Sequence, residues 1–351
     1  MIAVTPVRLG FLALFLGIPF GSFAQKEATP AWKHAGFITI LTDGQGANIP
    51  AGSVVQEFPL LVRLDKDFFD FNQAKPNGRD VRFSDGSGRT LAHQIEEWDA
   101  AQGIASISVR VPKILGNERK TLKMSWGRDV PNLSSGARVF SSNNGYLSVW
   151  HLGGEVRDEV GTLMSRDTGT TLVEGRIGKA RNFPGGKGIF GGDKITGFPT
   201  GVGSKHTTQA WIRPLKVNGR AVGWGNEEGQ GKVVMWYRSP PHVQMECYFS
   251  DANVSGEELT LPMPQWIHAV HTYEKGKSLL YLNGQLANTG NPGVTPLNVE
   301  RPARFWIGGW YDNYDYVGDI DEVRVSQFAR SAEWVRLEYE NQRAMQTLTG
   351  T

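Results

Sequence analysis

Two carboxylates late in the chain have the spacing that places them on one face of a strand. Asp319 and Asp321 are two residues apart, and side chains alternate between the two faces along a strand. By this alternation Asp321 shares a face with Val323 and Val325, which predicts a buried carboxylate. A buried carboxylate must be hydrogen-bonded, ion-paired or metal-bound. Backbone N–H groups of a neighbouring loop and a bound cation are therefore both open as partners for Asp321.

An aromatic-rich loop between two predicted strands is the strongest candidate for ligand binding. Aromatic rings stack on the apolar face of a sugar, and carboxylates and amides hydrogen-bond its hydroxyls. At about 25 cal/mol per Å² of buried apolar surface, one or two rings predict weak binding, roughly millimolar to micromolar. The alternative is that the rings pack against another domain or cover the edge of a sheet. The candidates are Trp310, Tyr311, Asp312, Asn313, Tyr314, Asp315 and Tyr316, with Trp224 and Trp236 as weaker ones.

Other chemistries lack their residues. The sequence holds no Gly-x-Ser-x-Gly and no His-Glu-x-x-His, which argues against the common hydrolase and metalloprotease motifs. His268 and His271 are three apart, so on a strand they face opposite ways. The 37 Lys and Arg residues nearly balance the 35 Asp and Glu residues, which gives no electrostatic reason to expect a nucleic-acid partner.

Short strands must position these residues. Runs rich in β-branched and aromatic residues predict strands, and Asn283-Gly284 predicts a hairpin turn. A single helix is predicted from Ser331, a favourable N-cap, to about Arg343. The predicted strands are 58–64, 80–84, 104–111 and 121–126 in the first part of the chain, and 208–213, 232–237, 243–249, 266–273, 279–282, 304–307 and 320–325 in the second.

The N-terminus predicts export. An apolar run from Leu9 to Phe20 follows Arg8, and Ser22-Phe-Ala24 fits the small-x-small rule for signal peptidase, so residues 1–24 are predicted to be a signal peptide cleaved after Ala24. The apolar run is shorter than the roughly 20 residues of a membrane span. No second apolar stretch approaches that length, so no membrane span is expected in the mature chain. The expected location is periplasmic or extracellular.

Several blocks of sequence resemble known families. Residues 58–64, 78–85, 94–98 and 124–127 resemble blocks of the bacterial DUF2341 domain, which the resemblance places at 32–130. Residues 149–152, 175–183, 281–284 and 318–325 resemble a laminin-G-like/concanavalin A-like domain, placed at 145–345. The resemblance implies an all-β chain, in which a small N-terminal β-sandwich is followed by a concanavalin A-like (laminin-G-like) jelly-roll sandwich.

The resemblance also bears on chemistry. This fold hosts glycoside hydrolases, whose glucanases use Glu-x-Asp-x-(x)-Glu on a strand, and no such motif occurs here. The nearest match is 155–159, in which Asp158 falls on the wrong face. The resemblance further implies a structural Ca²⁺ bound by Asp321. Asp158, in the loop that follows residues 150–152, is our own candidate for a second ligand.

These observations favour an exported, non-catalytic, lectin-like protein of the bacterial cell envelope that binds a polysaccharide or glycoconjugate. A structural or protein-interaction component that docks onto envelope proteins is the alternative. An enzyme whose carboxylates come from distant strands is the third hypothesis, because sequence spacing cannot show such a site.

Overall fold

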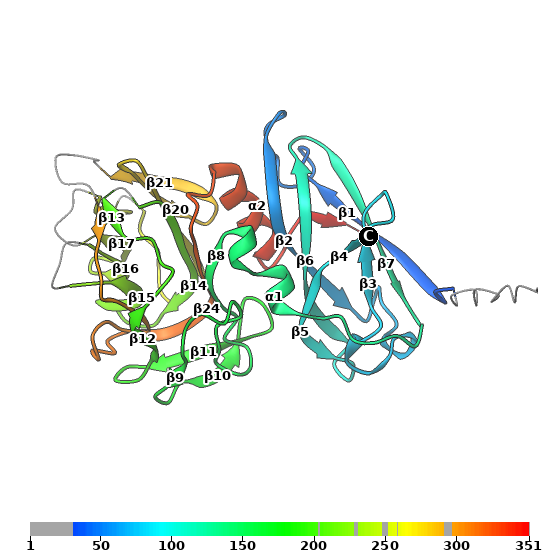
Figure 1. Cartoon of the computed structure of the whole chain (residues 1–351), viewed down its shortest axis with the longest axis horizontal. Helices are drawn as coiled ribbons and strands as arrows, with labels where there is room; N and C mark the ends of the chain where they lie inside the picture. The colour runs from blue at the N-terminus through cyan, green and yellow to red at the C-terminus, as the bar shows by residue number, and fades with distance from the viewer. Residues whose placement is uncertain are drawn as a thin grey trace, which may run out of the picture. The chain divides into compact units, whose positions relative to one another are not determined.

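The structure is a computed structural model that describes residues 31–202, 204–227, 231–247, 252–257, 259–290 and 297–350. The predicted signal peptide and the end of the predicted strand 243–249 lie outside the described residues. From Trp32 onward the chain forms one compact unit. Strands dominate this unit, as the sequence predicts (Figure 1).

The first sandwich is built from two antiparallel sheets. In one sheet the order is β25-β1-β7-β3-β4, and in the other it is β2-β6-β5. Their inner faces share one apolar cluster that includes Phe58, Val81 and Ile107. The strands are β1 His34–Leu41, β2 Val54–Asp65, β3 Arg82–Ser84, β4 Thr90–Leu91, β5 His93–Asp99, β6 Ile104–Leu115, β7 Arg119–Trp126 and β25 Thr349–Gly350.

The second sandwich is larger and also has two main sheets. The β24 sheet has the order β10-β11-β24-β14-β19-β20-β21, with β8 also paired to β24. Asn283 and Gly284 have φ angles of 51° and 76°, so they form the predicted tight turn between β20 and β21. The strands of the β24 sheet are β8 Tyr146–Trp150, β10 Thr171–Glu174, β11 Lys179–Pro184, β14 His206–Pro214, β19 Ile267–Glu274, β20 Lys277–Leu282, β21 Gln285–Gly290 and β24 Val317–Ser326.

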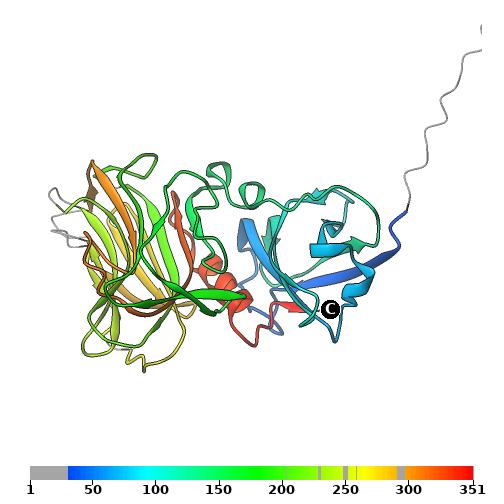
Figure 2. The same cartoon turned by 90° about the horizontal axis from the view of Figure 1, so that it is seen from below.

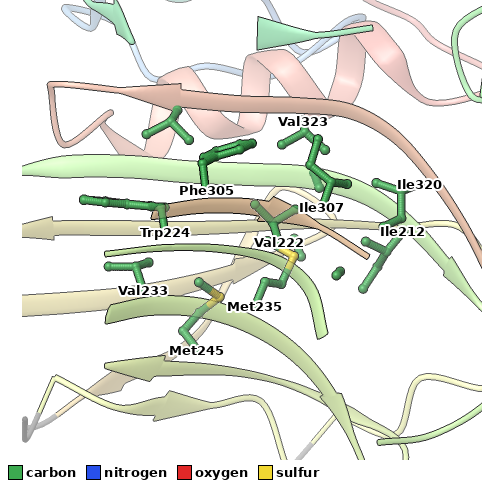
Figure 3. Close-up of a cluster of buried hydrophobic side chains, with 14 of the residues drawn as sticks. Ile212, Val222, Trp224, Val233, Met235, Met245, Phe305, Ile307, Ile320 and Val323 are labelled. Atoms are coloured by element: carbon green, nitrogen blue, oxygen red, sulfur yellow. The ribbon is translucent and has the colours of Figure 1, made fainter. Parts of the chain in front are cut away.

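The β16 sheet, ordered β18-β17-β16-β15-β23-β12-β9, packs face to face on the β24 sheet (Figure 2). Val222, Phe305 and Ile307 of the β16 sheet meet Ile212 and Ile320 of the β24 sheet in one buried cluster (Figure 3). The strands are β9 Arg166–Asp167, β12 Ile189–Ile195, β15 Gly219–Gly225, β16 Lys232–Arg238, β17 His242–Cys247, β18 Val254–Ser255 and β23 Ala303–Ile307; β13 Gly201–Val202 pairs separately with β22 Asn298–Val299.

The predicted helix is α2, Ala332–Gln342, and it contacts both sandwiches. The Ser331 side chain accepts a hydrogen bond from the Trp334 N–H and so caps the helix as predicted. Trp334 and Leu337 belong to the core of the first sandwich, whereas Val335 packs with Val270 and Tyr281 of the second. The short helices are α1 Gly136–Val139, η1 Phe71–Gln73, η2 Pro76–Gly78 and η3 Ser142–Asn144. Among the described helices, none combines the length and apolar character that crossing a bilayer requires.

A bulge in β24 redirects its side chains. The register with β14 shifts between Gln209 and Trp211, and Glu322 has a φ of 52°, as expected where an extra residue is inserted into one strand. Ile320 and Val323, although three residues apart, both enter the core. Asp321 therefore lies on the opposite side, and the prediction that it shares a face with Val323 and Val325 is wrong, because strict alternation fails at a bulge.

Two histidines lie inside the second sandwich and should make it sensitive to acid. His206 and His271 are fully buried, with ring centroids 5.1 Å apart. Burial lowers the pKa of His271 to about 3, whereas an unfolded histidine titrates near 6.5. Between these pH values the unfolded chain binds one more proton than the folded chain. The contribution of His271 to the free energy of unfolding is therefore fully present above pH 6.5 and is lost as the pH drops towards 3.

We expect the variant His271→Gln to reduce the slope of this loss by about 1 kcal/mol per pH unit. Urea unfolding at a series of pH values between 3 and 7 measures the slope. His34→Gln, at the half-exposed start of β1, is the control and should leave the slope unchanged. An unaltered slope in His271→Gln would contradict the prediction.

Candidate functional site

Two adjoining pockets lie along β5, an edge strand of the first sandwich. One is about 260 Å³ and the other about 280 Å³, and both are lined by Ile95 and Glu96. We call them the β5 pockets. The second pocket is bordered by the half-buried ring of Trp98 together with Asn77, Asn132 and Ser134. Charged side chains line the first: Glu96, Glu97, Glu155, Glu159, His151, Arg157 and Lys179.

Segments distant in sequence build the first pocket. His151 directly follows β8, and the turn 175–178 supplies Ile177 and Gly178. Asp321 holds this turn, because its Oδ2 accepts hydrogen bonds from the N–H groups of Arg176 (2.7 Å) and Ile177 (2.9 Å). A Cβ on Gly175 would lie 2.7 Å from the same oxygen, so only glycine allows this close approach.

At the base of the first pocket, one histidine meets two glutamates. His151 Nδ1 lies 2.7 Å from Glu322 Oε1 and 3.5 Å from Glu96 Oε2. Arg324 donates from Nε to Glu322 Oε2 (3.0 Å) and from Nη1 to Glu338 Oε1 (2.7 Å). A buried chain of charges thus runs from β5 through His151 and β24 to α2.

Burial and charge act in opposite directions on these groups. Burial lowers the pKa of His151, but the carboxylates of Glu322 and Glu96 outweigh it and raise that pKa to about 9. Burial raises the pKa of Glu96, with His151 opposing the shift. For Glu322 the attraction of His151 and Arg324 overcomes the effect of burial, so its pKa is lowered. The protein therefore keeps Glu322 ionised and His151 protonated.

The two predicted calcium ligands, Asp158 and Asp321, differ in how far protein hydrogen bonds already occupy their carboxylates. Asp158 accepts hydrogen bonds from the N–H groups of Val149, Val160, Thr162 and Leu163 and from the Thr162 hydroxyl. A carboxylate has about four lone-pair sites, so Asp158 has none left for an ion, which corrects its assignment as a ligand. Asp321 binds backbone N–H groups, the other partner that the sequence left open; calcium binding by Asp321 remains a prediction.

The aromatic loop is mostly folded onto the sheet rather than held out in solvent. Trp310 is 3% exposed and packs with Val234 and Trp306, and its Nε1 donates to Glu227 Oε2 (3.1 Å). Its ring lies over Gly223, where an added Cβ would be 2.5 Å away. The expectation of a solvent-facing Trp310 is therefore wrong, because a glycine on β15 leaves room for the ring. The sequence left open that the rings cover the edge of a sheet; Trp310 instead lies over β15, β16 and β23, which are inner strands of their sheet.

The other rings of the loop differ in burial. Tyr316 is fully buried in the main core, so it too is corrected as a ligand candidate. Tyr311 and Tyr314 are half-buried, while Asp312 and Asn313 are exposed at the turn. Asp315 accepts a hydrogen bond from the Arg220 N–H (2.8 Å) and is ion-paired with its guanidinium. Ligand contact by the partly exposed members of this loop remains a prediction.

The two tryptophans named as weaker candidates also differ in burial. Trp224 is fully buried among core side chains (Figure 3), and its Nε1 donates to Thr208 Oγ1 (2.8 Å). It therefore cannot contact a ligand from solvent. Trp236 is half-buried, with the guanidinium groups of Arg220 and Arg238 at 4.1 Å and 4.3 Å from its ring centroid. Trp236 keeps some accessible surface, so its role in binding remains a prediction.

Sequence reasoning did not identify Glu96, His151 and Glu322 as a group. His151 and Glu322 are 171 residues apart, and Glu96 comes from the other sandwich. Each residue lies within or beside a segment that resembles a known family, but spacing along the chain gave no sign that the three converge. The bulge that orients Glu322 towards His151 likewise has no recognisable sequence signal.

Comparisons with known proteins agree with this architecture. Residues 77–147 match the family model of the domain of unknown function DUF2341. Residues 192–336 match Laminin_G_3, described as the concanavalin A-like lectin/glucanases superfamily. A search of curated proteins finds no match to the chain.

The similar solved structures include two in complex with saccharides and one sialidase. Domain 4 of an extracellular GH43 arabinanase from Geobacillus stearothermophilus, in complex with arabinotriose, is 19% identical, with a TM-score of 0.44 over 55% of this chain and 97% of that one. The ligand-binding domain of botulinum neurotoxin serotype D, in complex with N-acetylneuraminic acid, is 14% identical (TM-score 0.42; 56% of this chain, 51% of that one).

A sialidase of Trypanosoma rangeli is 14% identical, with a TM-score of 0.43 over 70% of this chain and 42% of that one. The chain thus spans about half or less of the toxin domain and of the sialidase. With TM-scores below 0.5, these likenesses carry no further conclusion about the chain. With the family matches and the two sandwiches taken together, the chain carries a DUF2341 domain followed by a concanavalin A-like domain of the Laminin_G_3 family.

Proposed function

We propose that the protein is an exported, non-catalytic, carbohydrate-binding protein whose saccharide lies in the β5 pockets. The observation that carries the proposal is the pair of adjoining polar pockets, which share Glu96 and are bordered by Trp98. Carboxylates, amides and hydroxyls on their walls are the groups that hydrogen-bond sugar hydroxyls. The predicted signal peptide supports export, and the lack of a glucanase motif in the sequence supports binding without catalysis.

The size of the pockets suits a short saccharide. Each is slightly smaller than the roughly 300–1,000 Å³ of sites for drug-sized ligands, and together they suit a few polar units in a row. Trp98 packs edge-on against Phe69 and Phe71 and is only half-buried, so part of its surface is left for a sugar ring. Stacking on one face contributes about 2 kcal/mol, which predicts weak binding.

The variant Glu97→Gln tests the site with little change of shape. Glu97 lines the first pocket, and burial raises its pKa, with Lys179 opposing the shift. Replacing its carboxylate by an amide weakens charge-assisted hydrogen bonds to sugar hydroxyls, so we expect about tenfold weaker binding, equivalent to about 1.4 kcal/mol. Glycan-array screening identifies a bound saccharide, and calorimetric titration with it measures the effect.

Glu274→Gln is the matched control, because Glu274 ends β19 in the second sandwich and is not among the residues lining the β5 pockets. A loss of binding in Trp236→Ala but not in Glu97→Gln would move the site to the β16 sheet. Binding of no glycan at millimolar concentration would contradict the proposal and favour an envelope component that docks onto proteins. Release of reducing ends from a bound glycan would instead identify an enzyme.

A further inference from the structure

Three potential metal ligands converge at the base of the first β5 pocket. One ligand atom from each of Glu96, His151 and Glu322 lies within 4.8 Å of the ligand atoms of the other two. The separation of 3.5 Å between Nδ1 and Glu96 Oε2 is close to the roughly 3.4 Å between two ligands of a tetrahedral ion with bonds of about 2.1 Å. The 2.7 Å between Nδ1 and Glu322 Oε1 is a hydrogen-bond distance and would widen when an ion replaces the proton.

Each ligand is held from behind by another side chain. The Ser108 hydroxyl donates to Glu96 Oε1, and Arg324 Nε donates to Glu322 Oε2 (3.0 Å). His151 Nε2 lies 3.2 Å from Gln94 Oε1, an acceptor that holds the proton on Nε2, so Nδ1, beside the two carboxylates, is the nitrogen that would exchange its proton for an ion. Orientation by such outer partners is what metal-binding histidines and carboxylates generally have.

A proton alone satisfies this cluster incompletely. A proton on His151 Nδ1 reaches Glu322, but Glu96 Oε2 at 3.5 Å is too far for a good hydrogen bond. No described residue donates a hydrogen bond to that oxygen, and Glu96 lines the first β5 pocket, so water or an ion can reach it. A divalent cation would contact both carboxylates and the imidazole at once, and so would remove the repulsion between two buried negative groups.

We propose that Glu96, His151 and Glu322 bind a divalent transition-metal ion, for which Zn²⁺ is the best fit. One imidazole nitrogen and two carboxylate oxygens match the ligands of Zn²⁺, whereas Ca²⁺ takes six to eight oxygens. Because Glu96 and His151 also line the pocket of about 260 Å³, an ion can enter from it and a water molecule can take the fourth position. The proposal does not depend on saccharide binding.

Calorimetric titration with Zn²⁺ of the full mature chain, dialysed first against a chelator, tests the site. We expect one ion per chain, and a Co²⁺ derivative with the visible absorption of a four-coordinate nitrogen and oxygen site. His151→Gln should weaken binding about 100-fold or more, since loss of even an outer partner typically costs 10–100-fold. Glu96→Gln should weaken it similarly; its Oε2 accepts no hydrogen bond from a described residue, so the variant is expected to fold.

His242→Gln is the control, because His242 lies on β17 and, among the described residues, pairs with a single carboxylate, that of Glu257 (3.7 Å). It should bind Zn²⁺ as the parent does. Failure of the parent to bind Zn²⁺ or Co²⁺ at millimolar concentration, or equal affinity in His151→Gln, would overturn the proposal. If the metal site fails by these measurements, glycan binding by the chelated protein would still leave the saccharide site standing, so the two proposals fail separately.

Discussion

Removal of all residues after Arg330 is expected to unfold the first sandwich, although that sandwich begins about three hundred residues earlier in the sequence. The C-terminal segment completes its core through Trp334, Leu337 and Leu348. The ring of Trp334 packs edge-on against Phe58, with centroids 5.4 Å apart. Loss of these side chains would open the core of a small sandwich to water.

The same segment also satisfies backbone groups of the first sandwich. Asn341 accepts from the Leu61 N–H (2.7 Å) and donates to the Leu61 carbonyl (2.9 Å) on the edge strand β2. Arg63 donates to the carbonyls of Asn341 and Gln342 at the end of α2. β25 pairs with β1 at Thr39 and Ile40. Each buried group left without its partner costs about 1–3 kcal/mol, in addition to the loss of core packing.

A single substitution tests the argument without truncation. Trp334→Ala is expected to lower the free energy of unfolding by about 3–5 kcal/mol, the usual cost of removing a large buried aromatic. Glu333→Ala, the neighbouring half-exposed residue of α2, should change it by less than about 1 kcal/mol. Urea unfolding followed by tryptophan fluorescence measures both. A truncated chain that still protects the amides of β2 and β6 from hydrogen exchange would contradict the prediction.

The folding of the C-terminus onto the first sandwich is the main point that sequence patterns could not supply. The cap at Ser331, the spacing of apolar residues and the Asn283-Gly284 turn are local signals, and they predicted the helix and the hairpin correctly. The assignment of α2 to the second domain followed from the family resemblance, which placed that domain at 145–345. Which core receives Trp334 is decided by packing between segments at opposite ends of the chain.

The candidate site was harder to predict for a related reason. An aromatic-rich loop is easily identified in a sequence, but whether its rings lie in solvent depends on the surface beneath them. The absence of a side chain at Gly223 gives Trp310 a place to pack. Conversely, Glu96 and His151 stand among ordinary strand residues and carry no local signal. The bulge at Glu322 removes the alternation on which the assignment of Asp321 rested.

Replacement of the buried arginine at the centre of the charge network is the second large effect we expect. Arg324, Glu322 and Glu338 are each about 1% exposed, and Arg324 is the counterion of both glutamates. Arg324→Met keeps an apolar side chain over the ring of Phe140, which the guanidinium now covers at 5.1 Å. It leaves the buried carboxylate of Glu338 without its guanidinium partner and Glu322 with His151 alone. Breaking a buried pair in this way costs about 3–5 kcal/mol.

Surface and double variants separate the effect of charge from that of packing. Arg119→Met removes the arginine that pairs with Asp43, and the side chain of Arg119 is 59% exposed. Exposed ion pairs contribute about 0–1 kcal/mol, so the free energy of unfolding of this variant should hardly change. The double variant Arg324→Met/Glu338→Gln should recover part of the loss, because it removes one unpaired charge at nearly constant volume. Urea unfolding at constant pH measures all three. If the double variant were less stable than Arg324→Met alone, unpaired charge would not be the cause, since relieving it can only favour the folded state.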